Sequence, residues 1–168
     1  MRPSRLGAAA LAVTALAALT LTAQAATFTV RNLTPETALK AAQAALAKCR
    51  AGGYQVAVAV VDRGGITQVV LRDRLAGPHT IEVATNKAWT AVSFRTATRD
   101  LERLTRPGES MSGLRNTPRF MAIGGGIVVE AGGSLLGGIG VSGAPGGDAD
   151  HACAAAGIEA VTEELELQ

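Results

Sequence analysis

The sequence predicts an α/β domain of the α+β kind, in which helices flank an antiparallel sheet in the order α-β-β-α-(α)-β-β-α. Two observations lead to this prediction. Short apolar runs bounded by glycine-rich turns occur in two pairs, and each pair has the pattern of a hairpin. Segments with helical periodicity precede, separate and follow these pairs. Hairpins separated by helices build an antiparallel sheet rather than a doubly wound parallel one.

The first half of the chain begins its regular structure with a clear helix start. Thr34 is a good N-cap, Pro35 suits the first helical position, and Glu36 places an acid in the first turn. Gly52 ends this helix, and the residues before it, 27–30, form either a short strand or a tail. The elements expected in this half are a helix at 35–50, strands at 54–61 and 66–72 around the turn 62–65, and a helix at 80–96.

The second half is dominated by a glycine-rich hairpin, since more than half of the 20 glycines lie between positions 124 and 147. Glycine permits close backbone approach, so we expect this hairpin to lie tightly against another subunit, a ligand, or only the next helix. Valine at Gly125 or Gly140 should therefore disrupt folding or assembly. The elements expected here are a short helix at 98–104, an exposed loop at 106–118, strands at 127–129 and 135–141 around the turn 130–134, and a helix at 148–165.

One motif in this hairpin matches the dinucleotide-binding pattern G-x-G-x-x-G, at Gly138, Gly140 and Gly143. That site needs a parallel strand after the following helix. The residues after Gly143 predict a single helix and no further strand, so a tight hairpin explains the glycines better. Ser142 is likewise not in the spacing of a nucleophile elbow.

The strand at 54–61 is apolar at both its odd and its even positions. Both faces of the sheet are therefore expected to be covered at this strand. Either an oligomer or a second layer of helices would satisfy this expectation.

The first 25 residues have the pattern of a signal peptide. Arg2 and Arg5 precede an uncharged run rich in alanine and leucine at 6–21, and Ala23-Gln24-Ala25 fits a small-x-small cleavage site. An uncleaved membrane anchor is the alternative. We expect residues 1–25 to be removed and residues 26–168 to form a single domain that is exported, to the periplasm or as a secreted protein. No other stretch is apolar enough to span a bilayer.

The charge balance argues against nucleic-acid binding. The whole chain has 16 basic and 14 acidic residues, and without Arg2 and Arg5 it has 14 of each. A neutral domain with few aromatic residues lacks the electrostatic signature of a nucleic-acid-binding surface. The processed length of about 140 residues suits one domain with a substantial core.

The two cysteines of an exported chain suggest a disulfide. Cys49 lies on the apolar stripe of the first helix and Cys153 on that of the last helix, so the thiols can meet if these helices pack side by side. Two buried free cysteines are the alternative. Their spacing relative to the histidines does not match a zinc site.

Several segments, in order along most of the chain, carry a family likeness. They are VAVVDRGG at 58–65, Arg72 and Asp73 with GPHT at 77–80, NKAWTA at 86–91 with Phe94, IGGG at 123–126, GGIGVSG at 137–143 and GDAD at 147–150. The chain resembles the GlcG/HbpS-like haem-binding family, also called the haem-degrading domain family. The resemblance implies a profilin- or PAS-like antiparallel sheet, homo-oligomers, and haem binding in some exported members.

Haem iron is held by histidine, methionine, cysteine or tyrosine side chains. His79 directly precedes the helix at 80–96, where the helix N-terminus disfavours the cation and keeps the imidazole free to bind a metal. We therefore take His79 as the first candidate for the iron ligand, with local packing as the alternative. His151 follows Asp148 and Asp150, whose charges should favour its protonated form, and it is the second candidate for contact with the cofactor.

Basic side chains could pair with the haem propionates, and Arg72, Arg74 and Lys87 are the candidates. An ordinary solvated surface is the alternative for these three. Met111 in a polar loop and Tyr54 at the start of a strand are weaker iron ligands, and Met121 is expected in the core.

The residues favour binding over catalysis. Asp62 and Asp73 are possible functional carboxylates, although turn chemistry explains Asp62 equally well. Three functions follow in order: an exported haem-binding or haem-sequestering protein, an enzyme or enzyme accessory that acts on haem or a small metabolite, and an oligomeric module without a cofactor.

Overall fold

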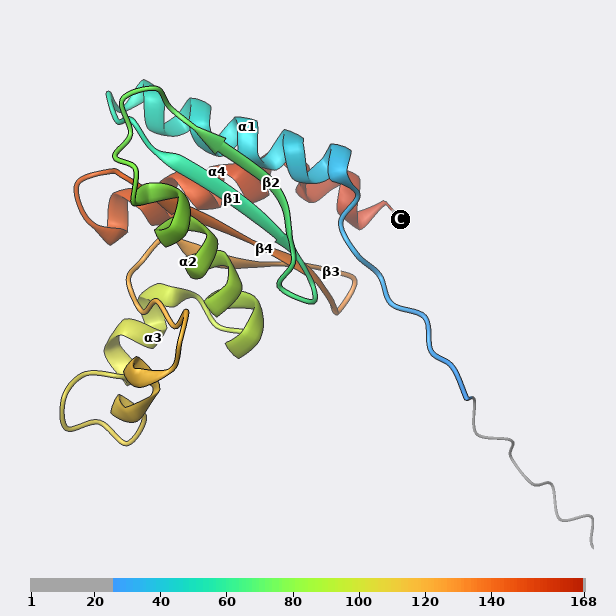
Figure 1. Cartoon of the computed structure of the whole chain (residues 1–168). Helices are drawn as coiled ribbons and strands as arrows, with labels where there is room; N and C mark the ends of the chain where they lie inside the picture. Colours follow the sequence, from blue (N-terminus) through green and yellow to red (C-terminus); the bar gives the residue numbers. More distant parts are fainter. Residues whose placement is uncertain (1–25, 168) are drawn as a thin grey trace, which may run out of the picture.

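The structure, a computed structural model, describes residues 26–167. The predicted signal peptide, 1–25, lies outside the described residues. Residues 26–34 have no regular secondary structure, so of the two expectations for residues 27–30 the tail is correct (Figure 1).

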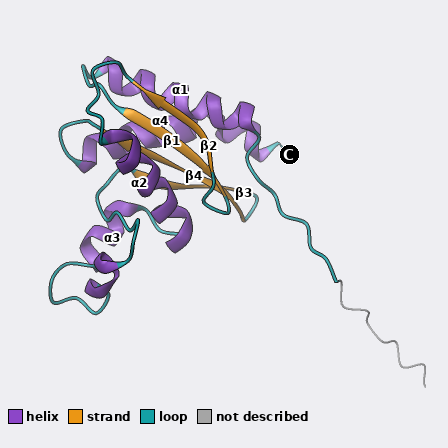
Figure 2. Ribbon diagram, viewed as in Figure 1, coloured by secondary structure: helices purple, strands orange, loops and turns teal. Residues whose placement is uncertain are grey.

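The core of the fold is a four-stranded antiparallel sheet with the strand order β2-β1-β4-β3. Two hairpins build it, and β1 and β4 pair at the centre in register from Ala57 opposite Ser142 to Asp62 opposite Gly137. The strands are β1 (Ala57–Asp62), β2 (Thr67–Arg72), β3 (Gly126–Ala131) and β4 (Ser134–Ser142). Figure 2 shows this sheet between the helices. The predicted class, an antiparallel sheet with flanking helices, is confirmed.

The helices cover both faces of the sheet. α1 and α4 pack against each other on one face, and α2 covers the other (Figure 1). The helices are α1 (Pro35–Ala51), α2 (Thr80–Phe94), α3 (Thr98–Leu104), a 3-10 helix η1 (Ser112–Asn116) and α4 (Gly147–Glu166). The observed order of elements agrees with the prediction, with η1 added inside the expected loop.

The start of α1 follows from its sequence. The Thr37 backbone N–H donates to Thr34 Oγ1 at 3.2 Å, and Pro35 occupies the first turn. These contacts satisfy groups that a helix end otherwise leaves unpaired.

The strand β1 is apolar on both faces, and other elements of the same chain cover both of them. The even-numbered valines, such as Val58 and Val60, lie in the large core with α1 and α4. On the opposite face Ala57 and Ala59 contact Ala84, and Val61 packs with Ala88 and Val92. A second layer formed by α2 therefore meets the requirement that an oligomer could also have met.

The glycine-rich hairpin packs directly on α2. A Cβ atom built at Gly140 would lie 2.0 Å from the Ala84 carbonyl oxygen of α2. At Gly125, where φ is +120°, it would lie 2.7 Å from the Val141 carbonyl oxygen and 2.8 Å from Asp150 Cβ. α2 precedes the hairpin in the chain, so it is not one of the three partners that were expected. The approach of Gly125 to Asp150 is a contact with α4, the next helix, which was one of the three.

The glycine motif at 138–143 lies in β4 and just beyond it. All strand pairs within residues 26–167 are antiparallel. The motif is therefore part of a hairpin and does not form the first turn of a βαβ unit.

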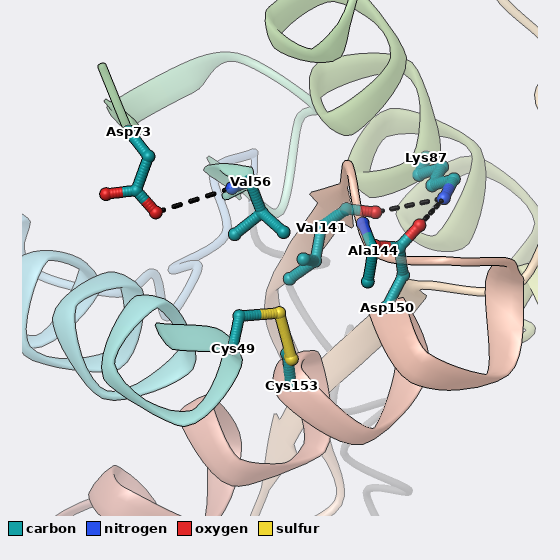
Figure 3. The surroundings of a disulfide bond; sticks show 8 residues. All are labelled: Cys49, Val56, Asp73, Lys87, Val141, Ala144, Asp150 and Cys153. Atoms are coloured by element: carbon teal, nitrogen blue, oxygen red, sulfur yellow. Dashed lines mark hydrogen bonds and ion pairs between the residues drawn. A yellow bond between two sulfur atoms is a disulfide. The ribbon is translucent and has the colours of Figure 1, made fainter. Parts of the chain in front are cut away.

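A disulfide joins Cys49 of α1 to Cys153 of α4, as the apolar stripes predicted, with the two Cα atoms 5.5 Å apart (Figure 3). Both cysteines lie in the large core between the helices and the sheet. The bond links positions that are 104 residues apart, so it ties together the first and last helices of the domain.

We expect loss of this bond to destabilise the domain. Closing so long a loop restricts the unfolded chain, and the chain-entropy model puts the contribution at about 4–5 kcal/mol. The variant Cys49→Ala/Cys153→Ala should unfold at lower guanidinium concentration than the oxidised wild type. Reductant should lower the wild-type midpoint and leave the double variant unchanged. Equal midpoints for oxidised and reduced wild type would contradict the prediction.

None of the helices within residues 26–167 is both long enough and apolar enough to cross a membrane.

Candidate functional site

His79 stands at the start of α2, where the chain turns from a loop into the helix. It occupies the N-cap position, its side chain is exposed, and the imidazole makes no capping hydrogen bond. It lines a cavity of about 350 Å³ between α2 and the beginning of α4. The other lining residues are Val83, Lys87, Ile123, Ser142, Gly143, Ala144, Gly146, Gly147 and Asp150.

A buried ion pair, Lys87 with Asp150, forms part of this cavity's wall. Lys87 Nζ lies 2.8 Å from Asp150 Oδ2 and donates to the Val141 carbonyl oxygen at 3.0 Å (Figure 3). Asp150 Oδ1 accepts a hydrogen bond from the Ala144 backbone N–H at 2.9 Å. The pair thus connects α2, the end of β4, the loop at 143–146 and α4.

Burial dominates the electrostatics of the pair. Desolvation lowers the pKa of Lys87 and raises the pKa of Asp150, while the charge and hydrogen bond of each partner oppose the shift of the other. Both side chains are almost fully buried, with 1% of Lys87 and 4% of Asp150 exposed. Removing one partner would leave an uncompensated charge in the interior.

This environment corrects the expectation of a solvated surface for Lys87. Its ammonium group already has two acceptors inside the protein, so it holds the fold together around the cavity. Pairing with a propionate would require one of these contacts to break. No local pattern links Lys87 to Asp150, which lies 63 residues further along the chain, so the order of residues alone does not reveal the pair.

Three further charged candidates lie around the loop that leads to His79. The guanidinium of Arg72 is exposed and donates to the Ala76 carbonyl oxygen. Arg74 is exposed in the same loop. Asp73 is buried and accepts from Arg50 Nε at 2.8 Å and from the Val56 N–H at 3.4 Å. It therefore anchors the loop to α1 and to the residue just before β1, and Figure 3 shows the bond to Val56.

His151 lies in a different cavity. Together with Ile127, Val128 and Ile158 it lines a groove of about 490 Å³ between β3 and α4. Burial and the nearby charge of Arg99 lower the pKa of His151, against the smaller opposite effects of Asp100 and Asp148. The expectation that neighbouring acids favour the protonated form is therefore wrong, because desolvation outweighs them.

The remaining candidates are spread over the molecule. Asp62 Oδ1 accepts from the backbone N–H groups of Gly64 at 2.8 Å and Ile66 at 2.9 Å, which makes it the turn residue of the first hairpin. Met111 is exposed near η1, and Tyr54 lines a third cavity beside Cys153. Met121, expected in the core, is only half-buried. Among residues 26–167 there is no group of three or more His, Cys, Asp or Glu side chains able to hold a metal ion.

Comparison with known proteins identifies relatives along nearly the whole described chain. Residues 33–159 match the model of a family described as haem degrading protein HbpS-like. A curated relative, an uncharacterized 15.0 kDa protein encoded in the dhaT–dhaS intergenic region of Citrobacter freundii, is 35% identical over 116 residues. The match covers 68% of this chain and 82% of that protein.

Two solved structures extend the likeness to three dimensions. A double mutant of HbpS from Streptomyces reticuli superposes with a TM-score of 0.76 at 36% identity, covering 94% of this chain and 97% of the other. A complex of PduOC with haem superposes with a TM-score of 0.73 at 31% identity, covering 77% of this chain and 94% of the other.

Proposed function

Since this chain belongs to the HbpS-like family of haem degrading proteins, we propose that it binds haem, and that His79 would hold the iron. The observation that carries the proposal is the exposed imidazole at the cavity edge, which makes no capping hydrogen bond at the helix start. A neutral imidazole is a standard ligand of haem iron. The similar structure of PduOC is a complex with haem, which supports this choice of cofactor.

The surroundings of His79 fit a porphyrin. Val83 and Ile123 supply apolar contacts in the same cavity. The beginning of α4 faces it too, and that helix has no side-chain cap on its first backbone N–H groups. Backbone donors at a helix start that no side chain caps suit a carboxylate, so they would hold a propionate in place of Lys87. Bound haem would supply redox and gas-binding chemistry, while His79 would orient the iron.

We further propose that the protein acts outside the cytoplasm, where it holds or sequesters haem. The pattern of residues 1–25 supports export to the periplasm or the medium. The disulfide between α1 and α4 is consistent with an oxidising compartment.

Haem titration tests the ligand assignment. Wild-type protein should develop a Soret band, and His79→Ser should lose at least about tenfold in affinity or shift the band, because one iron ligand is missing. Serine is a good N-cap residue, so this variant keeps the start of α2 intact. His151→Ala, in the other groove, is the matched control and should behave as wild type.

Two results would contradict this assignment. An unchanged spectrum and affinity in His79→Ser would remove its role as ligand. No haem binding by the wild type would remove the function and favour an oligomeric module without a cofactor.

Haem degradation is a second candidate, because the matched family is described by that activity. Adding a reductant and oxygen to the haem complex distinguishes the two functions. Loss of the Soret band faster than for free haem, together with an open-chain product in the mass spectrum, would indicate degradation. A stable band would indicate binding alone.

A further inference from the structure

The tail at residues 26–31 is an unusual surface feature. Phe28 is 88% exposed, which makes it the most exposed large apolar side chain of the described residues, and Val30 is exposed as well. The run Thr27-Phe28-Thr29-Val30 contains only residue types that favour β-strands, yet it belongs to no strand here. Figure 1 shows it extending away from the domain.

The groove beside β3 offers the strand edge and the apolar surface that this tail lacks. β3 is an edge strand, paired on one side with β4 and open on the other. Next to it lies the groove of about 490 Å³ formed with α4. Its apolar residues are Ile127, Val128, Ala155 and Ile158. An open edge strand with an apolar groove is a common place for an added strand.

The two features match in length and chemistry. The tail at 26–31 and β3 (Gly126–Ala131) are both six residues long. In an added strand alternate side chains point to the same side, so Phe28 and Val30 would face the groove together while Thr27 and Thr29 face away. An aromatic ring among Ile127, Ala155 and Ile158 would remove apolar surface of both partners from water.

The direction of the chain decides between its own tail and that of a second copy. Arg31 Nη1 donates to the Ala131 carbonyl oxygen at 3.4 Å, and the Leu33 N–H donates to the Leu136 carbonyl oxygen at 3.3 Å. The tail therefore joins its own domain at the far end of β3, and folding back would make it run parallel to that strand. The rest of the sheet is antiparallel. An antiparallel addition is available only from another molecule.

We propose that residues 26–31 of one copy add as an antiparallel strand to β3 of a second copy, with Phe28 seated in the groove beside α4. The exchange is reciprocal, so it closes a dimer with two-fold symmetry. The groove that contains His151 is then filled by protein, whereas the cavity at His79 stays open.

Interchain cross-linking tests the exchange in the full chain. Phe28→Cys and Ile158→Cys are made as separate variants and mixed under mild oxidation. The mixture should give a covalent dimer that contains one copy of each variant. Thr29→Cys replaces Phe28→Cys as the matched control and should cross-link far less, because its side chain points away from the groove.

A single chain carrying both cysteines checks the alternative in which the tail covers its own groove. A cross-linked monomer from that chain, without a dimer from the mixture, would overturn the proposal. No cross-link in either experiment would also overturn it.

Molar mass in solution gives a second, independent measurement. Wild-type protein should sediment as a dimer or a multiple of it. Phe28→Ser should raise the dissociation constant of that dimer at least tenfold, while Thr29→Ser should leave it unchanged. A monomeric wild type, or equal masses for wild type and Phe28→Ser at every concentration, would refute the exchange.

Discussion

Replacing Gly140 with valine should prevent the domain from folding. The backbone of β4 touches the backbone of α2 here, and a Cβ atom at Gly140 would lie 2.0 Å from the Ala84 carbonyl oxygen and 2.7 Å from the Ala88 nitrogen. Backbone atoms cannot move aside by a change of rotamer, so α2 would have to separate from the sheet. We expect a loss of more than about 3 kcal/mol, at the upper end of overpacking effects. Circular dichroism and thermal unfolding of the purified variant measure it.

Gly113→Val is the matched control for this substitution. No heavy atom lies within 4 Å of a Cβ built at Gly113, in the exposed segment around η1. This control should fold and melt close to wild type. If Gly140→Val kept the wild-type melting temperature, the close contact between β4 and α2 would be wrong.

Lys87→Met should cost about 3–5 kcal/mol, because it leaves the buried Asp150 carboxylate without its partner. The Asp150 side chain would retain only backbone N–H donors, those of Ala144 and Gly143, and β4 would lose the contact from Lys87 to the Val141 carbonyl oxygen. Urea unfolding at neutral pH measures the loss. The variant should also regain stability as the pH falls, since protonation removes the isolated charge on Asp150.

The double variant Lys87→Met/Asp150→Asn distinguishes the loss of the Lys87 hydrogen bonds from the effect of an unpaired buried charge on Asp150. It removes both charges and keeps an oxygen that can accept from the Ala144 N–H. We expect this double variant to be more stable than Lys87→Met alone. The stability losses of the two single substitutions would then not add up in a double-mutant cycle. Additive losses would contradict this account of the pair.

The exposed pair Arg103–Asp100 in α3 is the control for ordinary salt bridges. Its loss in Arg103→Ala should change stability by less than about 1 kcal/mol, because solvent screens the pair.

The structure places the two candidate histidines in different surroundings. His79 precedes α2 and His151 lies near the start of α4, and each was a candidate for contact with haem. The structure places His79 at an open cavity beside the start of α4, and His151 in the groove along the sheet edge. Haem binding at the first and strand exchange at the second are compatible, so they can be tested in the same set of variants.

The sequence by itself determined the local features of this protein. Thr34 and Pro35 begin α1, Asp62 shapes the first hairpin turn, and the alternation of hairpins and helices predicts the antiparallel class. The disulfide was also predictable, because Cys49 and Cys153 each lie on the apolar face of a helix. All of these features depend on neighbours within a few residues or on simple periodicity. Both can be read directly from the amino-acid sequence.

Only the tertiary structure decided what each segment packs against. The glycines of β4 predicted a close approach but did not identify α2 as the partner. The sequence was compatible with Lys87 on a solvated surface, whereas the fold buries it against Asp150. The acids near His151 predicted a protonated ring, whereas burial lowers the pKa of that imidazole. Burial and pairing arise from segments far apart in the chain. Desolvation can exceed the effect of nearby charges, so local sequence does not predict these environments.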